Sequence, residues 1–205
     1  MTQEQLAHEI AVGLVKTGIE GGFDSVSCST AGDYPSIGLS QWEGSRADKL
    51  LDMIPGGDRF SDCSYSHLSK QGLIPALKFF LDGPEGKAAQ LKMLEEDCCE
   101  YVDILWTVPD LDDSRCTIYA GMWCPTSHYV VSRFLKKRQE RGYNLRSLEA
   151  MRNMFRDEYA DAASIPSNCY EGYANRAEIT FQYVAGIDLT TLYGEPWYGQ
   201  TANGR

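Results

Sequence analysis

Apolar residues recur at helical spacing from the first residues of the chain. Leu6, Ile10 and Leu14 follow one another at intervals of four, which places them on one face of a helix over residues 2–18. Thr2 and Gln5 have the spacing of a capping box, in which each side chain bonds the backbone N–H of the other residue. Glycines at positions 18, 21 and 22 predict where this amphipathic helix ends.

The pattern changes after this helix. In residues 23–40, small polar residues, Gly and Pro alternate with single apolar residues, which is typical of a short irregular β-hairpin. Helical periodicity then dominates, and Pro125 predicts a break in the helical span 112–139. The expected helices are 44–54, 65–82, 85–106, 112–139, 144–162 and 169–185. We therefore expect a mostly α (α+β) fold with a small β-hairpin after the first helix, as a single domain over 1–185 followed by a C-terminal tail over 186–205.

Composition and charge narrow the classes of function. The formal net charge of −10 argues against a nucleic-acid partner, which requires a basic face. The basic cluster at 136–141 is interpreted as a helix end whose cations face the negative end of the helix dipole. No run of about 18 apolar residues exists, so no membrane insertion is expected. The polar start of the chain does not resemble a secretory signal, which predicts that the protein stays in the cytoplasm until another protein releases it. We also expect a monomer.

The seven cysteines do not follow a metal-binding pattern. None of them has the CxxC spacing of a zinc site, and their number is odd. We therefore expect mostly free thiols, no metal and no cofactor. The adjacent pair Cys98-Cys99 has no explanation in the sequence.

Candidate chemistry concentrates where the first helix ends. Glu20 stands there between Ile19 and two glycines, and apolar surroundings raise the pKa of a carboxyl group. Such a group can hold a proton near neutral pH and donate it to a leaving oxygen, while the glycines leave room for a bulky polymer. The hairpin that follows supplies hydroxyl, amide and aromatic groups of the kinds that contact sugars. The predicted substrate-binding residues in it are Tyr34, Ser36, Gln41 and Trp42.

The segment from Glu20 to Leu51 resembles the opening of the lysozyme-like domains in endolysins of phages that infect Gram-positive bacteria. The matching elements are Glu20-Gly21, Phe23, Ser25-Val26, Gly32, Ser36-Ile37-Gly38, Gln41-Trp42, Arg46-Ala47 and Leu50-Leu51, and 85–90 resembles a later helix start in the same family. The resemblance covers about residues 10–135, patchily after residue 54. It implies a lysozyme-like fold that cleaves the β-1,4 bond between N-acetylmuramic acid and N-acetylglucosamine in peptidoglycan glycan strands, with Glu20 as general acid. It also implies action on the wall after a holin-type release, or within a phage particle.

The order of features is also similar to goose-type lysozymes and soluble lytic transglycosylases. Gly38-Leu39-Ser40-Gln41 and Tyr119-Ala120-Gly121 stand where those families have a Gly-Leu-Met-Gln turn and a Tyr-Asn-Ala-Gly segment. The similarity implies that Tyr119 orients Glu20 or binds the acetamido group of the substrate. It also keeps open a lytic transglycosylase that forms 1,6-anhydro ends.

The chain departs from the endolysin pattern at two places. Ser29 and Thr30 replace acidic residues of the hairpin, and Cys124-Pro125 replaces an Asn-Gln pair. The second catalytic group is then open: Asp33 in the hairpin is our choice, and Asp24 is the other nearby carboxylate. Two rival functions remain, an inactive lysozyme-like structural component of a phage or injection tail, and a peptidase or amidase that uses Cys28 with a histidine base.

Overall fold

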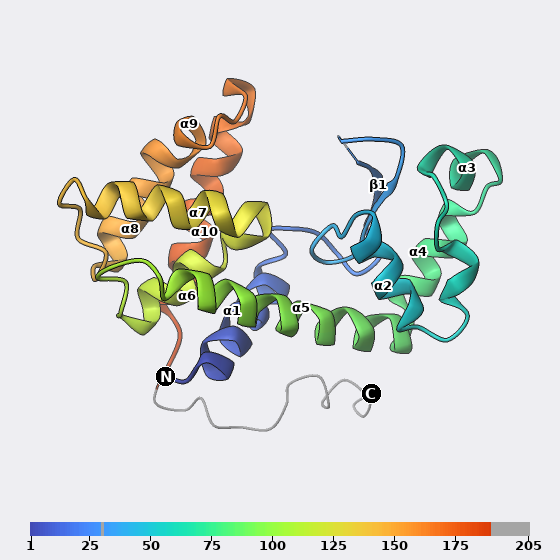
Figure 1. The fold of residues 1–205 in the computed structure, drawn as a ribbon, viewed down its shortest axis with the longest axis horizontal. Coiled ribbons are helices and arrows are strands. Elements are labelled where there is room, and N and C mark those ends of the chain that lie inside the picture. The colour runs from blue at the N-terminus through green and yellow to red at the C-terminus, as the bar shows by residue number, and fades with distance from the viewer. Residues whose placement is uncertain (30, 190–205) are drawn as a thin grey trace. The chain divides into compact units, whose positions relative to one another are not determined.

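The computed structural model describes residues 1–29 and 31–189 of the chain. They group into two compact units, one made of Met1–Ile19 with residues 95–189, the other of Glu20–Leu94. The domain predicted over 1–185 thus contains both units (Figure 1). Most of the predicted tail, residues 190–205, lies outside the described residues. No helix in the described ranges is both long and apolar enough to cross a membrane. The prediction of a mostly α fold with a small hairpin after the first helix is confirmed.

The opening helix α1 spans Gln3–Thr17 and follows its predicted signals. The capping box is present: Thr2 Oγ1 accepts from the Gln5 N–H at 3.3 Å, and Gln5 Oε1 accepts from the Thr2 N–H at 2.8 Å. Gly18 ends the helix in the left-handed region at φ 60°, with its N–H bonded to the Leu14 carbonyl at 3.0 Å. The face that carries Leu6, Ile10 and Leu14 is buried as expected.

The remaining elements of the first unit are helices and single helical turns. They are the second half of α5 (Pro84–Leu105), α6 (Ser114–Gly121), α7 (Cys124–Gln139), α8 (Leu148–Met154), a π-helical turn (Phe155–Tyr159), α9 (Ala160–Ala162), a 3₁₀ turn (Ser167–Cys169) and α10 (Tyr170–Ala185). Helix α1 packs on α6 and α10. Gly121 of α6 makes this approach close, because a side chain there would meet Ile10. The predicted break near Pro125 is confirmed, since α6 ends before α7 begins.

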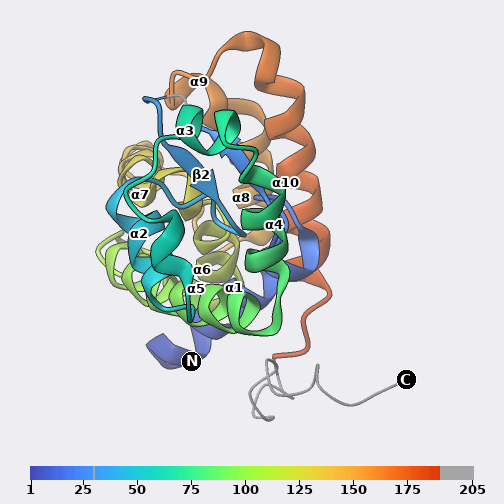
Figure 2. The same cartoon turned by 90° about the vertical axis from the view of Figure 1, so that its right-hand side faces the viewer.

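The second unit contains the hairpin and short helices. Strands β1 (Val26–Cys28) and β2 (Pro35–Ile37) pair antiparallel, with Ser27 opposite Ser36. After them come α2 (Ser45–Asp52), a 3₁₀ turn (Gly57–Phe60), α3 (Tyr65–Lys70), α4 (Ile74–Asp82) and the first half of α5. Helix α2 contacts β2 and α4 contacts β1 (Figure 2). The single helix predicted over 65–82 is wrong: Gly72, at φ 65°, separates α3 from α4.

Candidate functional site

Glu20 is the first residue of the second unit and stands immediately before a segment that folds against the hairpin. Its side chain is half-buried, and its Oε1 atom is inaccessible to solvent. The next residue, Gly21, contacts the 38–41 turn: a Cβ added there would lie 3.5 Å from both Gln41 Nε2 and the Gly38 carbonyl oxygen. The atom that a Cβ at this position would meet most closely is Ser25 Oγ, at 2.9 Å, and the 38–41 turn stands at ordinary contact distance.

Gln41 organises the turn that Gly21 contacts. Its Oε1 accepts hydrogen bonds from the hydroxyls of Ser27 at 2.9 Å and Ser36 at 3.2 Å, and its Nε2 donates to the Gly38 carbonyl at 3.0 Å. Its backbone is in the left-handed region, at φ 50°. A non-glycine residue held in this conformation carries a conformational cost that the surrounding bonds must offset. The structure thus fixes the amide of Gln41 beside the residue that follows Glu20.

A second carboxylate, which the sequence analysis missed, lies against the hairpin. Glu43 is half-buried, and its Oε2 accepts a hydrogen bond from the Ser29 hydroxyl at 2.8 Å. Ser29 follows strand β1 directly and lies two residues after Ser27, so the Glu43 pair and the Gln41 pair are neighbours in the hairpin. Glu43 thus places an acidic group beside Ser29, which is one of the two positions where this chain lacks the acidic residue of the endolysin pattern.

The side chain of Gln90, in α5, fixes the 38–41 turn through hydrogen bonds. Its side chain is 0% exposed, and all its bonds are to backbone groups: Oε1 accepts from the Leu39 N–H at 3.0 Å, while Nε2 donates to the carbonyls of Phe23 at 3.2 Å and Leu81 at 3.0 Å. Sequence analysis included Gln90 only as the end of a weak resemblance. The signal was an amide within an apolar stripe of α5, three and four residues before Met93 and Leu94.

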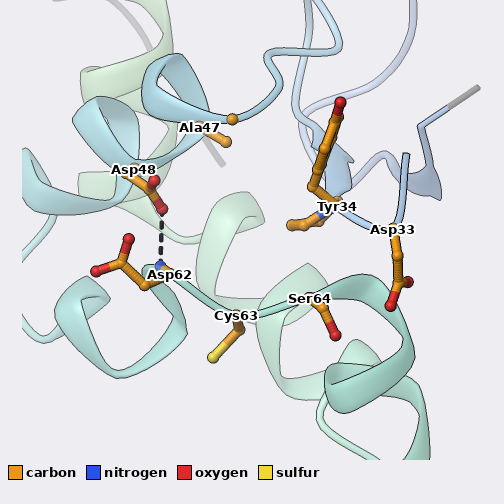
Figure 3. Close-up of a pocket in the computed structure, with 9 residues that line it drawn as sticks. Asp33, Tyr34, Ala47, Asp48, Asp62, Cys63 and Ser64 are labelled. Carbon is orange, nitrogen blue, oxygen red and sulfur yellow. Dashed lines mark hydrogen bonds between the residues drawn. The ribbon is translucent and has the colours of Figure 1, made fainter. Parts of the chain in front are cut away.

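Asp33 and Tyr34 lie at the tip of the hairpin, where they line a pocket of ≈ 260 Å³ (Figure 3). The Asp33 carboxylate accepts from the Ser66 N–H at 2.9 Å, and this bond holds its pKa below the usual value. Tyr34 is 38% exposed. The pocket contains two further carboxylates, Asp48 and Asp62, and Asp48 Oδ1 accepts from the Asp62 N–H at 2.9 Å. Oxygen acceptors beside an exposed ring suit a ligand rich in hydroxyl groups.

The hairpin separates this pocket from the turn beside Glu20. The Tyr34 carbonyl bonds the N–H of Ser29, whereas the Gly38 N–H bonds Ser25 at the other end of the hairpin. Four residues of extended chain between Tyr34 and Gly38 span about 13 Å. Asp33 and Tyr34 thus belong together, while Gln41, Ser36 and the residue after Glu20 form a second group. The assignment of Asp33 as the second catalytic group stays a prediction.

Three predicted substrate contacts are corrected by their burial. Trp42 is 4% exposed, and its backbone forms two hydrogen bonds with Ile37. Ser36 is 4% exposed and directs its hydroxyl to Gln41. Tyr119 is 0% exposed, donates its hydroxyl to the Ala177 carbonyl at 3.2 Å, and packs edge-on against Phe155. Tyr119 has no accessible surface and Trp42 has almost none, so both are core residues, while the nearly buried Ser36 positions Gln41.

The seven cysteines differ in their burial. All seven cysteines are free thiols, as expected for most of them. Burial raises the pKa of the Cys98, Cys116 and Cys124 thiols, which makes them poor nucleophiles. Cys28 is exposed, and its thiol contacts the Gly32 carbonyl at 3.8 Å. Over residues 1–29 and 31–189, no cluster of three or more His, Cys, Asp or Glu residues has a geometry that suits a metal ion.

Comparisons of this chain with protein-family models, with curated proteins and with solved structures give no match.

Proposed function

We propose that this chain is a peptidoglycan glycosidase of the lysozyme type, which cleaves the bond between N-acetylmuramic acid and N-acetylglucosamine with Glu20 as general acid. The observation that carries the proposal is the contact of Gly21 with the Gln41 turn, which sets a half-buried glutamate beside a hydrogen-bonded hairpin face. The pocket that holds Asp33 and Tyr34 supports it, because its acceptors and exposed ring suit a sugar of the same glycan strand.

Glu43 is the second carboxylate in this proposal. Inverting hydrolysis uses a base about 6.5–9.5 Å from the acid, with room for a water between them. Glu43 bonds Ser29 and Gln41 bonds Ser27, two residues earlier in the hairpin, and Gln41 in turn adjoins the residue after Glu20. Glu43 would take a proton from water as the water oxygen attacks the anomeric carbon. Glu20 would give its proton to the departing glycosidic oxygen, so that both products end in hydroxyl groups.

Asp33 suits this base role less well. Its carboxylate already accepts the Ser66 N–H, and its lowered pKa makes it a weaker base. We assign it to sugar binding at the hairpin tip. If neither Glu43 nor Asp33 acts as base, the remaining route is the lytic transglycosylase reaction. In that reaction Glu20 alone protonates the leaving oxygen and then removes the proton of the sugar's 6-hydroxyl as the 1,6-anhydro ring closes.

The test compares wall digestion by single variants of the purified chain. Glu20→Gln should lower the rate of soluble muropeptide release by about 10²–10⁴-fold, the usual contribution of a general acid. Glu85→Gln, a change at an exposed glutamate at the start of α5, is the matched control and should leave the rate unchanged. Circular dichroism would confirm that each variant is folded. Full wall clearing by folded Glu20→Gln protein would exclude the proposal.

Product analysis separates the two chemistries. Mass spectrometry that finds reducing N-acetylmuramic acid ends, together with loss of activity in Glu43→Gln, supports hydrolysis with Glu43 as base. Loss of activity in Asp33→Asn but not in Glu43→Gln would return the base role to Asp33. Anhydro ends with activity retained in both variants would establish the transglycosylase reaction. A folded wild-type chain that gives no band on a peptidoglycan zymogram would favour the inactive structural component, and sensitivity to iodoacetamide would favour the Cys28 enzyme.

A further inference from the structure

A stripe of basic residues on α7 lines a pocket in the first unit. Arg133, Lys137 and Arg141 follow one another at intervals of four, which places them along one side of the helix and the turn after it. They line a cavity of ≈ 250 Å³. Its remaining lining residues are Val130, Phe134, Arg138, Asp161 and Ala162. The sequence analysis interpreted the basic cluster as a solvated helix end, whereas the structure shapes part of it into a concave surface.

Arg138 differs from the three residues of the stripe. Its side chain is 9% exposed, its Nε lies 2.7 Å from Glu158 Oε2, and its guanidinium stands 4.7 Å from the centre of the Phe134 ring. Its charge is thus neutralised, and it belongs to the wall of the pocket. For Arg133, Lys137 and Arg141 the described part of the chain records no ion pair. Asp161 is the one carboxylate among the lining residues, and its Oδ1 accepts a hydrogen bond from the Tyr170 hydroxyl at 3.4 Å.

The helix dipole explains only part of this arrangement. Its effect is confined to the last turn, so it favours cations near Gln139 but not Arg133, more than one turn earlier. Three like charges around one cavity repel one another, and in a chain of net charge −10 they are a local exception. An anion in the pocket would offset that repulsion. Two guanidinium groups also offer the paired N–H donors that match the oxygens of a phosphate.

We propose that this pocket binds the phosphate groups of a phosphodiester polymer of the Gram-positive cell wall. The choice of a wall polymer rests on the proposed function, whereas the affinity for phosphate rests on the pocket alone. The cavity is the size of about eight water molecules, which accommodates a phosphate and its flanking carbons. Binding there would hold the enzyme on the wall through a contact separate from the glycan.

The lining favours a polyol phosphate chain over a nucleic acid. Proteins that bind single-stranded nucleic acids combine basic residues with aromatic faces on which bases stack. The aromatic residue of this lining, Phe134, is 3% exposed and offers no accessible face to a base. Val130 supplies apolar surface, which suits the CH₂ groups between successive phosphates.

The experiment measures binding of purified poly(glycerol phosphate) to the full chain carrying Glu20→Gln, which separates binding from catalysis. The triple variant Arg133→Gln, Lys137→Gln, Arg141→Gln should bind at least tenfold more weakly than this parent. The control variant Lys16→Gln, Lys70→Gln, Lys92→Gln removes the same charge from exposed positions outside the pocket and should bind as the parent does. The salt dependence should also fall, with the slope of log K against log salt smaller by about two to three in the pocket variant only.

Further variants and ligands complete the test. Asp161→Asn removes the opposing charge and should tighten binding severalfold. Equal weakening by the two triple variants would show general charge attraction and overturn the proposal, as would unchanged binding by the pocket variant or weaker binding by Asp161→Asn. Single-stranded DNA with the same number of phosphates should bind more weakly than poly(glycerol phosphate). Tighter binding of DNA would overturn the assignment to a wall polymer. Failure of Glu20→Gln to abolish digestion would refute only the glycosidase, because the binding assay does not depend on catalysis.

Discussion

Gln90→Leu should destabilise the protein far more than its conservative size suggests. The substitution introduces an apolar side chain of similar volume in α5 and removes three hydrogen bonds to the backbone of Leu39, Phe23 and Leu81. A buried donor or acceptor left without a partner costs about 1–3 kcal/mol. The Leu39 N–H loses the acceptor that the side chain supplied, and each of the two carbonyls loses one donor. We expect a total of about 3–5 kcal/mol, a large fraction of the stability of an ordinary domain.

Gln90→Glu tests the direction of these bonds. The introduced carboxylate can accept from the Leu39 N–H, but it places an oxygen against the carbonyls of Phe23 and Leu81, at the present 3.2 and 3.0 Å. Burial and these carbonyls would raise the pKa of the introduced group above its unfolded value of about 4.3. The loss of stability caused by the introduced charge is therefore small when the pH is below the unfolded pKa, and it grows as the pH rises through the folded pKa. The variant should lie closer to wild type at pH 4 than at pH 7.

The assay is thermal and urea unfolding followed by circular dichroism. Gln90→Leu should lower the Tm by roughly 6–20 °C, at about 2–4 °C for each kcal/mol. The control is Gln71→Leu at an exposed position after α3, which should change stability by no more than about 0.5 kcal/mol. A loss of less than about 1 kcal/mol in Gln90→Leu, or an equal loss in the control, would refute the conclusion that the three hydrogen bonds of Gln90 stabilise the fold. Wall digestion should fall with Gln90→Leu even at temperatures where it is folded, because Gln90 holds the turn that Gly21 contacts.

Three further outcomes follow from the structure. Gly38→Ala should destabilise more than Gly18→Ala in thermal melts. Both glycines have positive φ (71° and 60°), which costs about 1–2 kcal/mol for alanine, but only at position 38 does an added Cβ meet a neighbour, Gln90 Oε1 at 2.5 Å. Asp33→Asn should flatten the acid limb of a profile of Tm against pH. The lowered pKa of Asp33 gives stability that is present above about pH 4 and is lost as the pH falls through its folded pKa. A steeper acid limb in the variant would contradict this. Glu9→Gln should raise the Tm, compared with that of the wild type, more at pH 7 than at pH 4. Burial raises the pKa of Glu9, so its ionisation above that pKa opposes folding. The same change in Tm at both pH values would contradict this.

The local elements of this protein follow from the sequence alone. Helix α1, its capping box and its glycine stop were predicted because caps and apolar periodicity act over three or four residues. The same holds for the hairpin in residues 23–40 and for the break near Pro125. The division of 65–82 into two helices was missed, since one glycine interrupts an otherwise continuous apolar pattern there.

The tertiary structure alone decided which side chains reach the candidate site. Glu43 meets Ser29 across 14 residues of chain, and Gln90 meets Phe23 across 67. No local pattern specifies such contacts, because they arise only when separate elements pack. For the same reason sequence analysis placed Trp42 and Tyr119 on the substrate, whereas packing buries both. The sequence identified Glu20 as a candidate acid from the types of residue beside it in the chain. Burial and long-range hydrogen bonds, which depend on the tertiary structure, determined which other side chains are available at the candidate site.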